Sequence, residues 1–238
     1  DKVNAQIAVR LEREVGKNLT PLRREKLLAD IHAITADNLK DYTKGLNKEH
    51  VEFGGYESGY QAKAVNSLLV NVETVPATTA VVNKAAKNTL ITLGEGSYTT
   101  YNEMLRKYWS DNATQVTNIV ANGFQSGMTT RQIANDVMGE VDVRLSKTKK
   151  QAVSLARTGT NHYANQARKE YFEENDVIIG TRRIAVIDSA TSGFCRSVDN
   201  TVVLKSDSRY KNAFAPYHFS CRTANIPEIN GKYAQDDD

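Results

Sequence analysis

Two cysteines and a histidine in the C-terminal part of the chain are the residues best suited to chemistry. Cys195, His218 and Cys221 offer two thiolates and an imidazole, which are preferred zinc ligands, but a structural zinc ion takes four ligands. Asp188 could supply the fourth. The two cysteines could instead form a disulfide, or the three residues could be buried without a ligand. We expect neither a metal nor another cofactor, and these residues are the candidate ligands if a metal is present.

No group of residues in the sequence predicts catalysis. The segment Gly94–Gly96 lacks the rest of any phosphate-binding signature. His32, His50 and His162 fall in predicted helices without the spacing of metal ligands, and no nucleophilic partner for His218 can be identified. We therefore predict that the protein is not an enzyme.

Positive charge is concentrated in one stretch of the chain. The net charge of the whole chain is only +3, whereas Arg144 to Glu170 contains seven basic residues and one acidic residue. The candidate DNA contacts are Lys147, Lys149, Lys150, Lys205, Arg209 and Lys211. Because each exposed basic residue gains only weak, sequence-independent attraction to phosphate, an ordinary solvated surface is the alternative interpretation.

A polar stripe runs along the helix predicted around residue 160. Arg157, Asn161, Asn165 and Arg168 follow one another at helical spacing, so they share one face about 17 Å long. Arginine and asparagine side chains hydrogen-bond carbonyl and carboxylate groups. The stripe could fasten another part of the chain, contact a partner protein or bind phosphate.

Apolar residues at helical spacing dominate most of the chain. Helices are predicted at residues 2–14, 21–48, 56–70, 78–89, 99–122 and 145–174, with a further short helix after residue 129. Thr20 and Thr129 are expected to cap helices. Gly54 and Gly55 are expected to break the second helix, Gly123 to end the fifth, and Gly94 to Gly96 to form a turn.

After Asn175 the helical pattern gives way to β-branched residues. The runs 177–179, 182–187 and 201–204 predict strands. The sequence therefore predicts a mainly α protein with a small C-terminal β-containing (α+β) subdomain. We divide it into a helical N-terminal region, residues 1–125, and an α+β C-terminal domain, residues 126–238.

The composition is that of a globular protein, with 40% apolar and 25% charged residues. No apolar stretch approaches the roughly 20 residues that cross a bilayer, so no membrane contact is expected. Two cysteines are too few to suggest a secreted disulfide scaffold. Synthesis in a reducing cytoplasm is expected.

Several short motifs follow one another in a distinctive order after residue 126. These are Gly127-Met-Thr129, Ala156-Arg-Thr158 with Asn165 and Arg168, Asp188-Ser-Ala-Thr191 with Cys195, and His218-Phe-Ser-Cys221-Arg222. This order resembles the C-terminal domain of the Mu F-like head morphogenesis family of tailed phages, which contains minor head proteins. In that family an Arg-Thr-Glu helix leads through a strand to an Asp-x-Arg-Thr-Cys-x-x-Cys turn, a Leu-Asp-Gly turn and a His-Pro-Asn-Cys-Arg-Cys close. The resemblance covers about the last hundred residues.

The chain departs from the family pattern at five positions. Gly159 replaces Glu, Ala190 replaces Arg, Ser192 and Thr223 replace Cys, and Asn200 replaces Gly. The positions that match are Thr191, Cys195, Asp199, His218, Cys221 and Arg222. The Cys/His set is consequently smaller than the cluster of the family.

The resemblance implies a minor structural protein of a phage head. Its partners would be the portal protein or the major capsid protein, and its location the virion, after synthesis in the host cytoplasm. The structural motif would comprise Arg157, Asn165, Arg168, Asp188, Thr191, Cys195, His218, Cys221 and Arg222. We expect Arg157 and Asn165 to hold the two C-terminal turns through backbone carbonyls or Asp188. The alternatives are a DNA-binding virion protein that uses the basic cluster and a relative of toxin-like ADP-ribosyltransferases.

Overall fold

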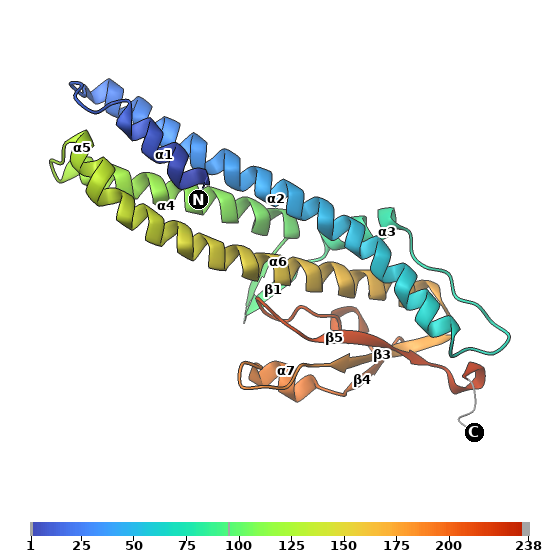
Figure 1. The fold of residues 1–238 in the computed structure, drawn as a ribbon. Coiled ribbons are helices and arrows are strands. Elements are labelled where there is room, and N and C mark those ends of the chain that lie inside the picture. The colour runs from blue at the N-terminus through green and yellow to red at the C-terminus, as the bar shows by residue number, and fades with distance from the viewer. Residues whose placement is uncertain (1, 95, 235–238) are drawn as a thin grey trace. The chain divides into compact units, whose positions relative to one another are not determined.

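The chain folds into helices and two small antiparallel sheets, in a computed structural model that describes residues 2–94 and 96–234 (Figure 1). Because 64% of the structure is helical and a small β part lies at the C-terminus, the predicted fold class is confirmed. None of the described helices is both long and apolar enough to cross a bilayer.

The helices agree broadly with the predicted ranges. They are α1 (Lys2–Glu12), α2 (Pro21–Asn66), α3 (Thr79–Asn88), α4 (Tyr101–Gln125), α5 (Thr130–Gln132), α6 (Met138–Glu174) and α7 (Gly193–Val198). A π-helical turn, Ile133–Val137, joins α5 to α6, and 3-10 turns cover Tyr210–Asn212 and Gly231–Tyr233. Two predicted caps are confirmed: Thr20 Oγ1 accepts a hydrogen bond from Arg23 N, and Thr129 forms a capping box with Gln132.

The strands form two separate sheets. β1 (Ile91–Gly94) and β2 (Ser97–Thr99) make a hairpin, and β3 (Ile178–Ile184), β4 (Val202–Leu204) and β5 (Ala224–Ile229) make a sheet in the order β4-β3-β5. The predicted strands at 177–179 and 182–187 are one strand that ends at Ile184. β5 is not among the predicted strands. It contains Pro227, which is tolerated there because β5 is an edge strand.

Gly54 and Gly55 do not break α2, so that prediction is wrong. A Cβ atom at Gly54 would lie 2.9 Å from Val82 Cγ1, and one at Gly55 would lie 2.2 Å from Thr79 Oγ1. Val82 and Thr79 belong to α3, so the two glycines allow α2 and α3 to approach closely. A glycine costs a helix only about 1 kcal/mol, which such packing can outweigh.

The predicted end of α4 and start of α6 are also corrected. α4 continues through Gly123 to Gln125, and Gly127 takes the left-handed conformation after it, with a φ of 80°. α6 begins at Met138 rather than at residue 145. Glu95, the centre of the predicted turn at 94–96, lies outside the described residues.

The chain divides into two compact units. We call Asp1–Leu46 with Glu103–Val153 the helical unit, and Asn47–Asn102 with Ser154–Asp238 the mixed unit. Both units draw on α2, α4 and α6. The predicted boundary between residues 125 and 126 stays a prediction. The core of the helical unit consists of Ile7, Leu11, Leu27, Ile31, Val116, Val120, Phe124, Ile133 and Val141.

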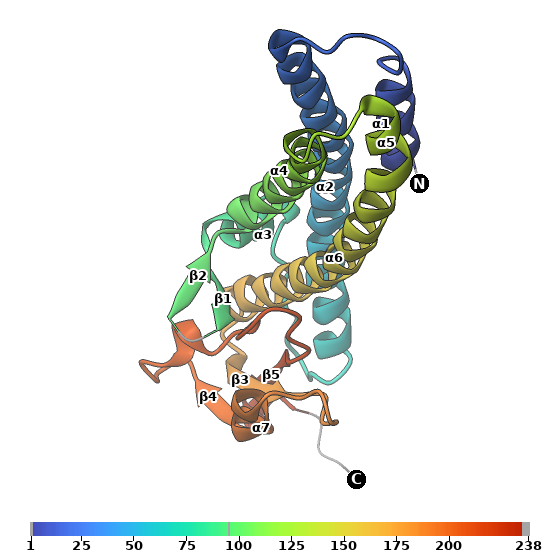
Figure 2. The same ribbon diagram turned by 90° about the vertical axis from the view of Figure 1, so that its left-hand side faces the viewer.

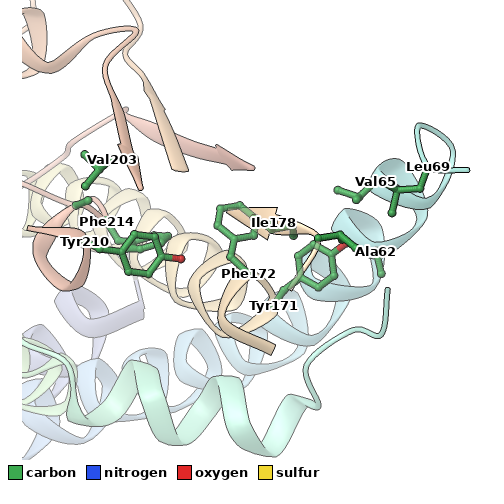
Figure 3. Packing of buried hydrophobic residues seen from close by; sticks show 11 residues of the cluster. Ala62, Val65, Leu69, Tyr171, Phe172, Ile178, Val203, Tyr210 and Phe214 are labelled. Carbon is green, nitrogen blue, oxygen red and sulfur yellow. The ribbon is translucent and has the colours of Figure 1, made fainter. Parts of the chain in front are cut away.

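The main core of the mixed unit forms where α2 and α6 end. Figure 3 shows Tyr171 and Phe172 of α6 between side chains of α2, among them Ala62, and those of the C-terminal segments, among them Phe214. Tyr171 and Phe172 are fully buried. Burial of the Phe172 side chain alone stabilises the fold by about 1.5–3 kcal/mol. A second, smaller cluster contains Ala185, Cys195, Ala215 and Cys221, with Tyr217 packed against it.

Candidate functional site

The polar face of α6 holds the C-terminal loop by its backbone. Asn161 Nδ2 donates to the carbonyl oxygens of Cys221, at 2.9 Å, and Thr223, at 3.0 Å. Asn165 Nδ2 also donates to Thr223 O, at 3.3 Å, and Asn165 Oδ1 accepts the backbone N–H of Asn225 at 3.0 Å. Because Asn165 is only 1% exposed, these bonds satisfy groups that water cannot reach.

The other residues of the polar stripe point elsewhere. Arg168 Nε lies 2.7 Å from Glu57 Oε1 of α2, and both side chains are largely buried. Arg157 is exposed and, within the described residues, makes no hydrogen bond to either turn. Thr158 beside it is fully buried, and its Oγ1 accepts the backbone N–H of Ser220 at 2.9 Å. The structure therefore brings Asn161, Asn165 and Thr158 to the loop, but not Arg157.

Asn225 of β5 is a site residue that the sequence did not reveal. It is fully buried, its Oδ1 accepts Ala215 N at 3.0 Å, and its Nδ2 donates to Ala213 O at 2.9 Å and to Thr181 Oγ1 at 3.1 Å. Asparagine is depleted in strands, so an asparagine two residues before Pro227 could have indicated a residue with a special hydrogen-bonding role. It links β3, β5 and the segment before His218.

The turn after β3 is closed by an ion pair with the C-terminal loop. Arg222 Nη1 and Nη2 each lie 2.6 Å from one carboxylate oxygen of Asp188, in the bidentate arrangement. Asp188 Oδ1 also accepts Ala190 N at 2.9 Å, and Thr191 Oγ1 accepts Asp188 N at 2.8 Å while donating to Val186 O.

Hydrogen bonds from Arg222 hold the pKa of Asp188 well below its ordinary value. Both side chains are at least 40% exposed, so the pair contributes little to stability and mainly fixes the position of the turn.

Cys195, His218 and Cys221 meet beside this ion pair. Cys195 Sγ lies 3.2 Å from His218 Nε2 and 3.8 Å from Cys221 Sγ, and the three ligand atoms all lie within 4.8 Å of one another. Cys195 belongs to α7, which lies beside the β4-β3-β5 sheet in Figures 1 and 2. Its backbone N–H donates to Ser192 Oγ, the N-cap of α7. Both cysteines are free thiols and buried.

The two thiols differ in acidity. Burial raises the pKa of Cys221 above its ordinary value. Burial acts in the same direction on Cys195, but hydrogen bonding with Ser192, Thr223 and His218 outweighs it, and the pKa of Cys195 is lowered. Cys195 is therefore the thiol that ionises first.

A small cavity of about 20 Å³ opens beside the cluster. It is lined by Ala185, Val186, Ala190, Thr191, Ser192, Cys195, His218, Ser220, Arg222 and Thr223. This volume holds about one water molecule. Thr223 Oγ1 is buried beside the two thiols and hydrogen-bonds no nitrogen or oxygen atom of the described residues. The cavity can therefore accommodate a small polar ligand but not a sugar or a nucleotide.

The candidate DNA contacts fall into two groups. Lys147, Lys149 and Lys150 are exposed residues of the helical unit, and no described acidic group forms an ion pair with them. The group in the mixed unit is partly engaged. Lys205 Nζ donates to Asn175 O at 3.0 Å, and Arg209 pairs with Asp207, which leaves Lys211 exposed.

Two other histidines are buried in the mixed unit. His50 Nδ1 lies 2.6 Å from Tyr101 OH, and His162 Nε2 donates to Ala86 O at 2.7 Å. Burial lowers the pKa of both to about 4, so both rings are neutral at pH 7. They stack with Tyr101 and Tyr163, and this arrangement is that of a packed core.

Comparison of the chain with models of protein families, with curated proteins and with solved structures gives no match. The functional argument therefore depends on the residues and their geometry.

Proposed function

We propose that this chain is a minor structural protein of a tailed phage head, associated with the portal or the inner capsid during head assembly. The proposal is supported by one observation above all: three of the four motif segments in the C-terminal part of the sequence, those around residues 156–165, 188–195 and 218–222, meet at a single site. Asn161 of α6 binds the loop at Cys221, the turn at Asp188 pairs with Arg222, and Cys195 contacts His218. Several motifs that meet at one site support the family resemblance more specifically than any one of the motifs does.

The backbone at two further positions supports the same proposal. Asn200 replaces the glycine of the family turn and has a φ of 55°, which is the left-handed conformation that asparagine adopts more readily than most residues. Asp199 Oδ1 accepts Ala185 N at 2.8 Å, so this aspartate fixes the turn to the end of β3. The departure at Asn200 therefore preserves the conformation that a glycine would take.

Fractionation of phage particles tests the proposed function. A tagged copy of the chain, expressed in infected cells, is expected to co-purify in low copy number with DNA-filled heads and with DNA-free procapsids. Cross-linking followed by mass spectrometry should join it to the portal or the major capsid protein. Absence from DNA-free procapsids, or cross-links to neither protein, would contradict the proposal.

The DNA-binding alternative depends on the exposed lysines of α6. A variant with Lys147, Lys149 and Lys150 changed to glutamine separates the two functions. A head protein that binds other proteins should enter particles as the wild type does. A protein recruited by DNA should be lost from particles with this variant.

We also propose that the chain has no catalytic activity. Cys195 Sγ and His218 Nε2 are a possible nucleophile and base 3.2 Å apart, but the cavity beside them has room for about one water molecule and not for a substrate. The purified protein should neither hydrolyse nucleic acid nor transfer ADP-ribose from NAD. A turnover that His218→Ala abolishes without unfolding the protein would contradict this and favour the transferase-like alternative.

A further inference from the structure

Cys195, His218 and Cys221 have the separations of ligands on one metal ion. For zinc–sulfur bonds of about 2.3 Å in a tetrahedron, two sulfur atoms lie about 3.8 Å apart. The observed distance between the two Sγ atoms is 3.8 Å. The sulfur atoms of a disulfide lie about 2.05 Å apart. The separation of the two thiols is therefore that of two ligands on one metal ion and not that of a disulfide.

The hydrogen bond made by His218 prepares its ring for a metal. His218 Nδ1 lies 2.9 Å from the carbonyl oxygen of Phe219, and a carbonyl can only accept, so Nδ1 carries the proton. In the neutral ring Nε2 is then unprotonated, and it faces Cys195 Sγ at 3.2 Å. A hydrogen bond from the second ring nitrogen to a carbonyl is the usual support of a metal-bound histidine.

The segments that carry the three ligands are fixed independently of any metal. Ser192 caps α7 and accepts the N–H of Cys195, while Arg222 pairs with Asp188. Asn161 holds the carbonyl of Cys221. The ligands therefore need little rearrangement to bind an ion, which lowers the entropic cost of binding.

A fourth ligand position is open to the small cavity. Two of the three ligands, Cys195 and His218, line this cavity together with Thr223. Thr223 is 1% exposed, and its hydroxyl lies beside both thiols but hydrogen-bonds no nitrogen or oxygen atom of the described residues. A water molecule on the metal would fill the cavity and satisfy this hydroxyl. Asp188 does not supply the fourth ligand, because both of its carboxylate oxygens are engaged by Arg222.

We propose that Cys195, His218 and Cys221 form a site for a thiophilic divalent ion of the zinc class, with a water molecule as the fourth ligand. Thiolate and imidazole ligands in tetrahedral geometry select zinc over magnesium or calcium. The ion joins α7 to the C-terminal loop, beside the exposed Asp188–Arg222 pair that ties the preceding turn to the same loop. The inference concerns a site of this chain and does not depend on the proposed function.

Cobalt binding to the full chain tests the site. The protein is purified under reducing conditions, stripped with a chelator and titrated with Co²⁺. It should bind one ion per chain and develop the visible bands of tetrahedral cobalt together with thiolate-to-cobalt charge-transfer bands. One equivalent of Zn²⁺ should displace the cobalt and raise the midpoint of thermal unfolding.

Variants assign the ligands. Cys195→Ser and His218→Ala should each weaken Zn²⁺ binding by at least about 100-fold, since changes to residues that only hydrogen-bond metal ligands already cost about 10–100-fold. His32→Ala, which changes a histidine in α2, should bind as the wild type does. Thr223→Cys places a thiol in the cavity as a fourth ligand and should tighten binding at least about tenfold. This gain in affinity cannot be produced by misfolding.

Three results would overturn the proposal. The first is less than stoichiometric binding without charge-transfer bands. The second is equal Zn²⁺ affinity of the wild type, Cys195→Ser and Thr223→Cys. The third is a Cys195–Cys221 disulfide in the isolated protein that persists after mild reduction and prevents metal binding.

Discussion

Asn165 connects α6 to the C-terminal loop through both polar atoms of its side-chain amide, Nδ2 and Oδ1. Asn165→Ala would leave the buried N–H of Asn225 without its acceptor, and we expect it to lower the free energy of unfolding by about 1–3 kcal/mol. The matched control is Asn88→Ala at the exposed end of α3, which should change it by less than about 0.5 kcal/mol. Urea unfolding measures both. Equal, negligible losses would show that this face of α6 does not hold the loop.

His50 and His162 make stability depend on pH. Burial lowers their pKa from 6.5 to about 4, so between these values the unfolded chain takes up protons that the folded chain cannot. The stability is therefore complete above pH 6.5 and falls as the pH drops toward 4. At pH 5 the loss is about 2 kcal/mol for each histidine.

Urea unfolding between pH 7.5 and pH 5 measures this loss. His162→Gln should reduce the pH dependence, whereas His32→Gln in α2 should leave it unchanged. A wild-type stability that is constant across this range would show that the two rings are not buried in their neutral form.

At the scale of elements, close helix packing in the mixed unit depends on glycines. A Cβ atom at Gly159 of α6 would lie 2.2 Å from His50 Cε1 and 2.6 Å from His50 Nδ1. His50 is itself held by Tyr101, so its ring cannot easily move aside. A Cβ atom at Gly59 of α2 would meet no atom within 4 Å.

Two alanine substitutions compare these positions. Gly159→Ala should lower the free energy of unfolding by about 1–3 kcal/mol, because overpacking outweighs the better helix propensity of alanine. Gly59→Ala should be neutral or raise it by up to about 1 kcal/mol. Chemical denaturation checks both, and a stabilising Gly159→Ala would mean that α6 does not pack on His50.

At the scale of the whole molecule, the exposed lysines of α6 predict weak, salt-sensitive DNA association. Each phosphate contact contributes about 0.9 to the slope of log K against log salt, so replacing Lys147, Lys149 and Lys150 with glutamine should flatten the slope by about two to three. The control replaces Lys26, Lys44 and Lys107, which are exposed lysines of the same unit. This variant should keep the wild-type slope. Equal slopes for the two triple variants would mean that the cluster on α6 is an ordinary solvated surface.

The sequence by itself determined the features that depend on residues close together in the chain, namely the helical class and the helix caps. The helical class follows from apolar spacing such as Leu27 to Ile31, and the caps at Thr20 and Thr129 follow from residues within a few positions of each helix start. These interactions close short loops at little entropic cost, so they are visible in a local pattern.

Only the tertiary structure decided the features that join distant segments. Gly54 remains helical because α3 packs on it, and β5 forms because β3 offers a partner. The meeting of Cys195 with His218 likewise depends on α7 and the C-terminal loop being held together. Such contacts are selected by packing and by the satisfaction of buried polar groups across many residues of chain, and no single stretch of sequence carries that information.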